Sequence, residues 1–329
     1  MPREFTLGEV RYLLRTVEPE DAPDVVALFT RVFGAPPPEG WYAWKYGAEG
    51  LQGRAVGLWD ENGRLFAHYG GTPRHLLWHG KPVAAVQIGD VMVAPEARGL
   101  LSRRGPFFQV CSAFFGQWVG GGKPFALAFG FPNVRHLRLG VKLGLYHDLG
   151  AITTAQWGAG KNRLPFGWRA VEIDVRTPEF DRIIERAWRQ QAEEGKDRIL
   201  GGRDPDYVRR RYALRPGVTH HYIACRRWGT GSTAVAIVRQ EGETLRWLDF
   251  IGPSKRLSAT AGAVRLFADK LGATVVETWA SSASALDLHR AGAAIGPEAA
   301  RFALARASLC QADVLTRDGW WLAGDTDFL

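Results

Sequence analysis

Hydrophobic residues recur along this chain with two kinds of spacing, and each change of spacing indicates where a strand ends and a helix begins. Apolar runs over residues 83–93 and 124–131 favour strands, whereas residues 107–119 place apolar side chains at helical spacing. The turn before this helix is basic and contains one glycine, Ser102-Arg103-Arg104-Gly105-Pro106. A strand that enters a helix through such a turn points free N–H groups and the positive end of the helix dipole at one spot. The pattern therefore predicts a site for a phosphorylated cofactor, to which three arginines add charge: Arg98, Arg103 and Arg104.

The order of the expected elements repeats once along the chain. In the first half they cover residues 10–17, 22–33, 41–46, 54–60, 64–78, 82–93, 107–119, 124–131 and 133–143, with a last strand after Gly144. In the second half they cover residues 169–175, 178–194, 204–212, 220–226, 233–239, 245–251, 257–271, 274–280 and 284–291, with final strands around 301–309 and 320–323. Single residues repeat as well, because Lys45-Tyr46 has its counterpart in Arg211-Tyr212 and Asp90 in Asp249.

This repeat predicts an α/β (α+β) protein with two tandem domains, each a mostly antiparallel twisted sheet flanked by helices. We expect a first domain over residues 1–157, a linker over 158–166 and a second domain over 167–329. The length of 329 residues agrees with two domains of ordinary size.

Composition and charge narrow the classes of function. No window approaches the roughly 18 uninterrupted apolar residues of a membrane span, and the start lacks the apolar core of a signal peptide. The three cysteines are far apart, so we expect no disulfide frame, no metal site and a cytoplasmic setting. The net charge of +8 suits an anionic ligand, but the basic residues are dispersed, which favours a solvated surface over a nucleic-acid partner.

Two segments, Val93-Ala94-Pro95-Glu96-Ala97-Arg98 and Phe131-Pro132-Asn133 with Lys142-Leu143-Gly144-Leu145-Tyr146 after it, resemble the GNAT superfamily of N-acetyltransferases. The likeness covers the first half well and the second by order of elements. The tail over residues 320–327 is similar to two-domain members, which are often linked to bacterial surface-polysaccharide synthesis. The resemblance implies acetyl-coenzyme A, or another acyl-coenzyme A, as co-substrate.

The resemblance also implies a role for particular residues. The backbone of Met92 and Val93 would bond the pantetheine arm, and the N–H groups of residues 103–105 the pyrophosphate. Asn133 would bond the cofactor near its thiol, although an asparagine before a helix is also a plain cap.

Two departures from the family pattern concern the same site. The pyrophosphate turn is commonly Q/R-x-x-G-x-G/A, whereas this turn keeps one glycine and is lengthened. Many members have a tyrosine two residues before the lysine, where it protonates the leaving thiolate; this chain has Gly140 there. Tyr146 is a substitute acid, or else the packed start of a strand.

Asp90 is the expected general base, because a carboxylate on an apolar strand is partly desolvated. A structural ion pair with an arginine is the alternative. His68 and His75 are rival bases on the preceding strand, or partly exposed spacers. Three residues are candidates for the acceptor side, of which the last two could instead form an exposed acidic tail: Trp41, Asp325 and Asp327.

The leading hypothesis is an acyl-coenzyme A-dependent N-acyltransferase that acts on a small-molecule primary amine, an amino sugar included. A non-catalytic acyl-coenzyme A-binding protein and an aminoacyl-tRNA-dependent transferase are the alternatives. The second-half turn, Ile251 to Leu257, lacks a Gly-x-Gly pattern and carries Pro253, which has no N–H to donate. We therefore expect the second half to bind no coenzyme and to form one wall of the acceptor cleft.

Overall fold

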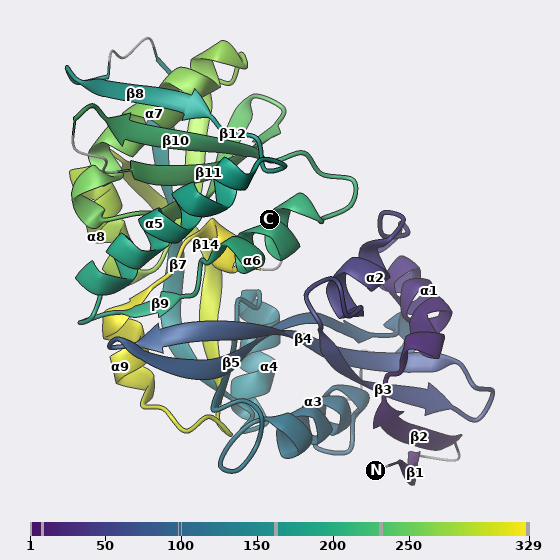
Figure 1. Cartoon of the computed structure of the whole chain (residues 1–329). Coiled ribbons are helices and arrows are strands. Elements are labelled where there is room, and N and C mark those ends of the chain that lie inside the picture. Colours follow the sequence, from purple (N-terminus) through teal and green to yellow (C-terminus); the bar gives the residue numbers. More distant parts are fainter. Residues whose placement is uncertain are drawn as a thin grey trace.

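The computed structural model describes residues 2–7, 10–97, 99, 101–160, 164–229 and 233–326. These residues form one twisted sheet of fifteen strands, flanked by helices (Figure 1). The strands are β1 (Arg3–Leu7), β2 (Val10–Thr16), β3 (Arg54–Asp60), β4 (Leu65–Trp78), β5 (Lys81–Val93), β6 (Leu127–Gly130), β7 (Tyr146–Gly158), β8 (Trp168–Glu172), β9 (Ile199–Gly201), β10 (His221–Arg227), β11 (Thr233–Glu241), β12 (Thr244–Ile251), β13 (Val275–Ala280), β14 (Ala294–Ala305) and β15 (Gly319–Trp320).

The longer helices have the expected positions, because their apolar faces pack against the sheet at helical spacing. The helices are α1 (Ala22–Phe33), α2 (Trp41–Tyr46), α3 (Pro106–Trp118), α4 (Val134–Lys142), α5 (Pro178–Glu194), α6 (Pro205–Val208), α7 (Leu257–Lys270), α8 (Ser282–Arg290) and α9 (Ala312–Asp318). A π-helical turn, Arg209–Ala213, continues α6. The sequence pattern did not predict β1, β9 and α9. No helix in the described residues combines the length and apolar character that a bilayer crossing requires.

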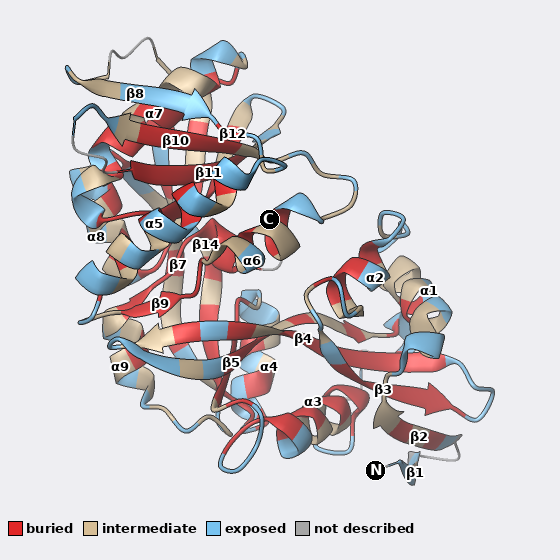
Figure 2. Cartoon of the chain, viewed as in Figure 1, coloured by how far each residue is buried: buried red, intermediate tan, exposed pale blue. Residues whose placement is uncertain are grey.

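The strand order is β1-β2-β3-β4-β5-β6-β14-β7-β13-β12-β11-β10-β8, and β9 joins β4 to β15. Most neighbouring strands are antiparallel; β5·β6, β12·β13 and β9·β15 are parallel. The expected fold class is confirmed: a mixed α/β arrangement with a large, twisted and mostly antiparallel sheet flanked by helices. Strands β10 and β11, inside the edge strand β8, are buried along most of their length, whereas β8 is largely exposed (Figure 2).

The two halves exchange strands in the middle of the sheet. Strand β14, from the end of the chain, pairs with β6 and β7 of the first half, and β7 pairs with β13 of the second half. Sequence spacing does not predict these pairings, since they join segments about 120 to 175 residues apart. The predicted boundary at residues 158–166 follows β7, and residues 161–163 of it lie outside the described part of the chain.

The repeat is visible in matching bonds. In each half, a tyrosine hydroxyl donates to the Oδ2 atom of the corresponding aspartate at 2.6 Å, Tyr46 to Asp90 and Tyr212 to Asp249. Each half also has a shift of register between its two long antiparallel strands, near His68 in β4 and near Ile237 in β11. The Asp90–Asp249 correspondence predicted from the sequence is therefore a structural one.

A buried ion network joins the halves and the end of the described chain. Arg203 lies 2.6 Å from Asp249 and 2.7 Å from Asp325, and Arg74 of β4 lies 2.7 Å from Asp325. All four side chains are buried. Burial disfavours the charge on Asp325, but Arg203 and Arg74 outweigh it and lower the pKa of Asp325. Burial raises the pKa of Asp249 in spite of Arg203.

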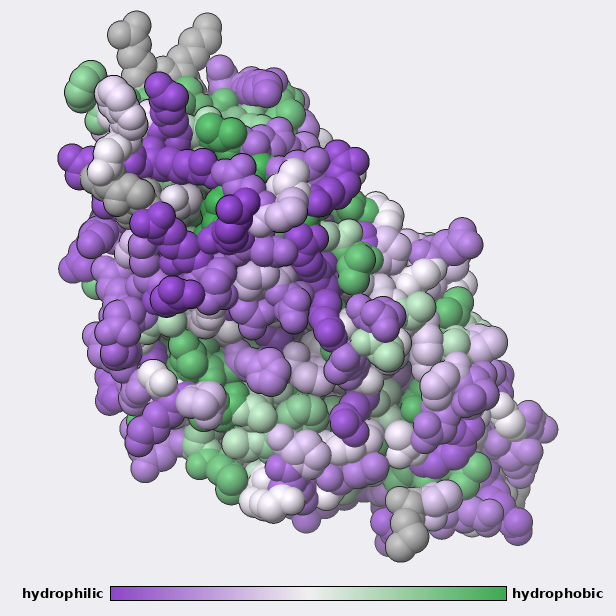
Figure 3. All heavy atoms as spheres, viewed as in Figure 1, coloured by the Kyte–Doolittle hydropathy of each residue, from purple (hydrophilic) through white to green (hydrophobic). Residues whose placement is uncertain are grey.

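Polar residues cover most of the face shown in Figure 3, especially over the second half. The network contrasts with this surface, because its charges have left water and depend on one another.

We predict that Asp325→Asn lowers the free energy of unfolding by about 3–5 kcal/mol, because it removes the carboxylate that two buried guanidinium groups share, Arg74 and Arg203, of which Arg203 keeps Asp249. Urea denaturation followed by circular dichroism measures this. The control is Glu185→Gln, which removes an exposed pair with Arg189 on α5 and should change the free energy by less than about 0.5 kcal/mol. Equal effects of the two changes would contradict the role given to the network.

Candidate active site

The site begins where two parallel strands separate. Strands β5 and β6 pair from Ala85↔Leu127 to Gln87↔Phe129, and no pairing between them continues beyond that point in the described chain. Strand β5 runs on to Val93, so its edge from Ile88 onward faces an opening. A cavity of about 400 Å³ lies in this opening and is lined by Ile88 to Val91 on one side and Phe129 to Asn133 on the other.

A bulge at Asp90 accompanies the separation. The register between β4 and β5 shifts between His68 and Gly70, and Asp90 has a left-handed backbone with φ of 50°. Bulges bend the strand that contains them, and aspartate is one of the few residues besides glycine that tolerates this conformation. The strand is therefore bent at the same residue whose carboxylate was expected to act.

The Asp90 carboxylate is held by two residues of α2. Lys45 Nζ lies 2.8 Å from Asp90 Oδ2, and the Tyr46 hydroxyl donates to the same oxygen at 2.6 Å. Both partners of the ion pair are nearly inaccessible, with 4% and 9% of their side chains exposed. An ion pair was foreseen for Asp90, but with an arginine; that expectation is wrong, because the short helix α2 brings a lysine to the carboxylate instead.

His68 supports the bulge from the neighbouring strand. Its Nδ1 atom lies 2.7 Å from the backbone oxygen of Asp90, and since a carbonyl only accepts, Nδ1 carries the hydrogen. Burial lowers the pKa of His68, which favours the neutral ring. His68 is fully buried and does not line the cavity, so its geometry fits a role in positioning Asp90. His75 is exposed further along β4 and is not among the cavity residues.

Tyr146 takes the place of a side chain that Gly140 lacks. A Cβ atom added at Gly140 would lie 2.0 Å from the Cδ2 atom of Tyr146, so the tyrosine ring covers the glycine directly. The Tyr146 hydroxyl lies 2.8 Å from that of Tyr69, next to the thiol of Cys111. Burial raises the pKa of Tyr146 well above its usual value, so the phenol keeps its proton. Tyr146 lines the cavity, which is compatible with both of the roles considered for it.

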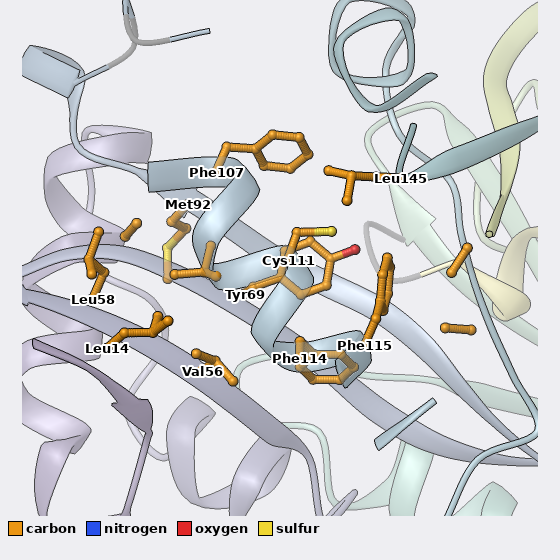
Figure 4. Packing of buried hydrophobic residues seen from close by; sticks show 14 of the residues in the cluster. Leu14, Val56, Leu58, Tyr69, Met92, Phe107, Cys111, Phe114, Phe115 and Leu145 are labelled. Atoms are coloured by element: carbon orange, nitrogen blue, oxygen red, sulfur yellow. The ribbon is translucent and has the colours of Figure 1, made fainter. Parts of the chain in front are cut away.

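Tyr146 belongs to the buried hydrophobic cluster of the first half, part of which is shown in Figure 4. Tyr69 of β4 packs against Phe114 and Phe115 of α3, with ring centroids 5.3 and 5.6 Å apart. His68 and Tyr69 are adjacent in β4, so their side chains point to opposite faces, His68 toward Tyr46 of α2 and Tyr69 toward α3. The cavity consequently has an α2 side, with Asp90, and an α3 side, with Tyr146.

Asn133 is a helix cap, as one of its two expected roles requires. Its side chain accepts the N–H of His136 at 2.9 Å and begins α4, and it also lines the cavity. Contact with a cofactor stays a prediction.

His136 is a cavity residue that the sequence pattern did not predict. Its ring lies 4.9 Å from that of Phe107 and 5.9 Å from that of Tyr146, and its Nε2 atom is buried without a partner in the described structure. Burial lowers the pKa of His136 to about 4. Its place three residues after the helix cap is the signal that could have found it, because that position lies in the first turn, beside the cap.

The backbone N–H groups of the basic turn bond differently from the expectation. The N–H groups of Arg104 and Gly105 bond within the turn, to the side chain and backbone of Ser102 at 3.3 and 2.9 Å. The N–H groups of Phe107 and Phe108, in the first turn of α3, have no backbone acceptor in the described chain. An anion at this helix end would therefore meet different donors from those predicted.

The arginines predicted to bind the pyrophosphate differ in position. Arg103 and Arg104 are exposed at the start of α3, and the Arg103 guanidinium lies beside Gly144. The predicted binding residue Arg98 lies outside the described residues. Met92 is fully buried in the core of the first half (Figure 4), and the part of β5 that lines the cavity is Ile88 to Val91, just before Met92 and Val93.

The residues expected to bind the acceptor do not lie together in the structure. Trp41 lines the cavity on its α2 side. Asp325 does not, because it is buried in the ion network with Arg203 and Arg74; the exposed tail considered for it is therefore wrong. Asp327 lies outside the described residues.

Comparison with known proteins agrees with this geometry. Residues 14–138 match the family profile described as an acetyltransferase (GNAT) domain. The fold is similar to that of a probable N-acyltransferase of unknown function from Enterococcus faecalis, with a TM-score of 0.65 and 14% identity over 89% of this chain and 72% of that one. It is also similar to a GCN5-related N-acetyltransferase from Anabaena variabilis, with a TM-score of 0.64 and 14% identity over 92% of this chain and 75% of that one.

A more distant likeness is to the N-myristoyltransferase of Saccharomyces cerevisiae with bound myristoyl-CoA, with a TM-score of 0.52 and 10% identity over 92% of this chain and 84% of that one. No protein of curated function matches the sequence. At these identities the structural likenesses establish the fold.

We predict that Gly140→Ala lowers the free energy of unfolding by about 1–3 kcal/mol, because the new methyl group would overlap the Tyr146 ring. The matched control is Gly116→Ala in α3, where a Cβ atom meets nothing within 4 Å and the change should stabilise by about 0.5–1 kcal/mol. Chemical denaturation of both variants tests the contact. Stabilisation by both would show that Tyr146 does not fill this space.

His136 should make folding stability depend on pH. Between its usual value of 6.5 and the folded value of about 4, only the unfolded chain takes up the proton, so stability falls as the pH falls through this window of the His136 pKa. The full slope of one proton is about 1.4 kcal/mol per pH unit. We expect His136→Gln to flatten the pH dependence of the urea midpoint between pH 6.5 and 4, and His75→Gln, at an exposed site, to leave it unchanged. A slope that is unaffected by His136→Gln would contradict this.

Proposed function

We propose that this chain, which carries a GNAT acetyltransferase domain over residues 14–138, is an acyl-coenzyme A-dependent N-acyltransferase that acts on a primary amine. The amine belongs to a small molecule or is carried on a sugar, and acetyl is the default acyl group. The observation that supports this best is the early separation of β5 and β6, with a cavity between them and a helix N-terminus close by in the chain.

The unpaired edge of β5 can hold an extended donor arm. A strand edge offers N–H and C=O groups in a regular row, and an extended chain can bond to such a row as an added strand. Residues 88–93 supply this edge, so Met92 and Val93 stay candidates together with the cavity residues before them. The free N–H groups at the start of α3 and the exposed Arg103 and Arg104 would meet a diphosphate.

Asp90 and Tyr146 are our candidates for the two proton transfers of acyl transfer. Attack by an amine needs a base for the ammonium proton, and departure of the thiolate needs a donor. Asp90 lies on the α2 side, held by Lys45 and Tyr46, and can receive the amine proton directly or through water. Tyr146 lies on the α3 side as a protonated phenol whose hydroxyl is oriented by Tyr69. The acceptor would therefore approach from α2 and the donor from α3.

We propose further that residues 1–157 bind the donor and that residues 167–329 bind none, because the chain fills its second site itself. Strands β12 and β13 pair from Thr244↔Val275 to Arg246↔Glu277, with no pairing beyond this in the described chain. The 3₁₀ turn Ala323–Asp325 packs against both strands. A Cβ atom at Gly324 would lie 2.2 Å from the Tyr212 hydroxyl, so the turn fits tightly.

A carboxylate of the chain also lies at the start of α7, the helix that follows β12. Glu194 accepts the backbone N–H of Ser254 at 2.5 Å and its hydroxyl at 2.9 Å, just before α7. A carboxylate of the chain thus lies where the first half offers its donors to an anion. The packed turn and the Glu194 carboxylate together support the proposal that the second half binds no donor.

Two alternatives predict different behaviour. A non-catalytic acyl-coenzyme A-binding protein is favoured by the Lys45–Asp90 ion pair, which compensates the charge of the expected base. An aminoacyl-tRNA-dependent transferase would bind tRNA with a steep loss of affinity as salt is added. Release of free coenzyme A in the presence of primary amines, measured with a thiol reagent, supports the transferase; binding of acetyl-coenzyme A without release supports the binding protein.

Asp90→Asn should lower the turnover number by about 10²–10⁴-fold and leave the affinity for acetyl-coenzyme A unchanged, because the amide cannot take the amine proton. Asparagine tolerates the left-handed backbone at this position and can still accept the bonds from α2. The thiol-release assay and calorimetric titration measure the two quantities. Asp148→Asn, at an exposed pair with Arg301, is the control. An unchanged turnover number in Asp90→Asn would make Asp90 purely structural.

A further inference from the structure

The α2 side of the cavity has a wall that comes from both halves of the chain. Phe29, Phe33, Trp41 and Trp44 belong to α1 and α2, whereas the loop after the π-helical turn contributes Arg215, Pro216 and Val218. Contacts between the halves hold this loop in place. The Trp44 indole N–H donates to the backbone oxygen of Arg210 at 2.7 Å, and the Arg215 guanidinium lies 5.5 Å from the centre of the Trp44 ring.

An unbroken series of aromatic rings leads from solvent to Asp90. Phe33 is 57% exposed and lies 4.5 Å from Phe29, which lies 5.0 Å from Trp41 (centroid distances). The Trp41 ring is 6.0 Å from that of Tyr46, whose hydroxyl donates to Asp90. A molecule that brings an amine to Asp90 by this route passes along aromatic surfaces.

The same wall offers little to a molecule rich in hydroxyl groups. Lys45 and Asp90 bond to each other, and the indole N–H of Trp44 is used by Arg210. Phe29, Phe33 and Pro38 have no polar side-chain atoms, and neither have Pro216 and Val218 of the loop. The other polar side-chain groups on the wall are the Trp41 indole and the Arg215 guanidinium, which lies over the Trp44 ring. Each hydroxyl that leaves water without a partner costs free energy, whereas an apolar group gains by burial.

We propose that the acceptor is a primary amine on an aromatic body, and that Phe33, Phe29 and Trp41 select it. This inference rests on the proposed function and chooses between its two acceptor classes. The ring of the acceptor packs along the aromatic series, and the amine reaches Asp90. Transfer then joins the amine nitrogen to the acyl carbon and breaks the carbon–sulfur bond. The amine proton goes to Asp90, and the released thiolate takes the proton of the Tyr146 hydroxyl, which water then restores.

The test compares phenethylamine, ethylamine and glucosamine as acceptors of the acetyl group in the thiol-release assay on the full chain. We expect kcat/KM for phenethylamine to exceed that for either of the others by at least about tenfold, since one aromatic ring buried in an apolar pocket is worth that factor or more. A higher kcat/KM for glucosamine would overturn the inference and leave the transferase activity standing.

Phe33→Ala provides the residue-level test. Because Phe33 is at the exposed end of the series, the change should spare folding while it lowers kcat/KM for phenethylamine by about 3- to 10-fold. The value for ethylamine and the KM for acetyl-coenzyme A should stay unchanged. The matched control is Phe166→Ala, at a fully exposed phenylalanine that does not line the cavity. An equal loss for ethylamine and phenethylamine would contradict a selective role of Phe33.

A binding readout separates this inference from the proposed function. Calorimetric titration of phenethylamine into the protein with coenzyme A present should show binding that Phe33→Ala weakens about 3- to 10-fold. If no amine is acetylated but this binding is found, the transferase proposal fails and the aromatic site stands. If none of the three amines is acetylated and phenethylamine does not bind, both fail.

Discussion

The structure depends on a pair of parallel strands that bond over three residues and then part. Backbone N–H and C=O groups that face an opening must find partners, in water, in protein or in a ligand. In the first half, β5 parts from β6 after Gln87 and its edge borders a cavity. In the second half, β12 parts from β13 after Arg246, and the turn at Ala323–Asp325 packs against both strands. The same strand geometry therefore borders a cavity in one half and a packed turn of the chain in the other.

The turn that packs against β12 and β13 explains why charged side chains are buried here. Asp325 comes to the second opening with the turn that fills it, and Arg203 and Arg74 compensate its charge there. Arg74 belongs to β4, the strand that carries His68 and Tyr69 nearer the cavity. The network consequently fixes the end of the chain, the second half and the strand that supports the candidate site in one arrangement. Such a network is costly to break, although its net contribution to stability need not be large.

Local patterns in the sequence predicted a large part of this fold. Helical spacing found α1, α3, α5 and α7, and the repeat of elements was sufficient to relate Asp90 to Asp249 and Tyr46 to Tyr212. These features depend on residues close together in the chain, where propensity and period are informative. The fold class followed from the order of elements.

Contacts between distant segments could not be predicted in the same way. The insertion of β14 between β6 and β7, and the short strand β9 beside β4, depend on register across long separations. The site shows the same limit. Lys45 is one residue from Tyr46, yet it reaches the Asp90 carboxylate only because α2 lies beside the bulge of β5. In the sequence, Gly140 indicated that the usual tyrosine acid is missing. In the structure, the absence of a side chain at Gly140 leaves room for the Tyr146 ring.

The most direct measurement of the central claim is hydrogen–deuterium exchange of the full chain with and without acetyl-coenzyme A. Amides that gain a hydrogen-bond partner exchange more slowly. We expect slower exchange in peptides over residues 88–93 and 105–109, and no change over 252–258 and 322–326. Equal protection in both halves, or a bound donor that leaves residues 88–93 unprotected, would contradict the claim.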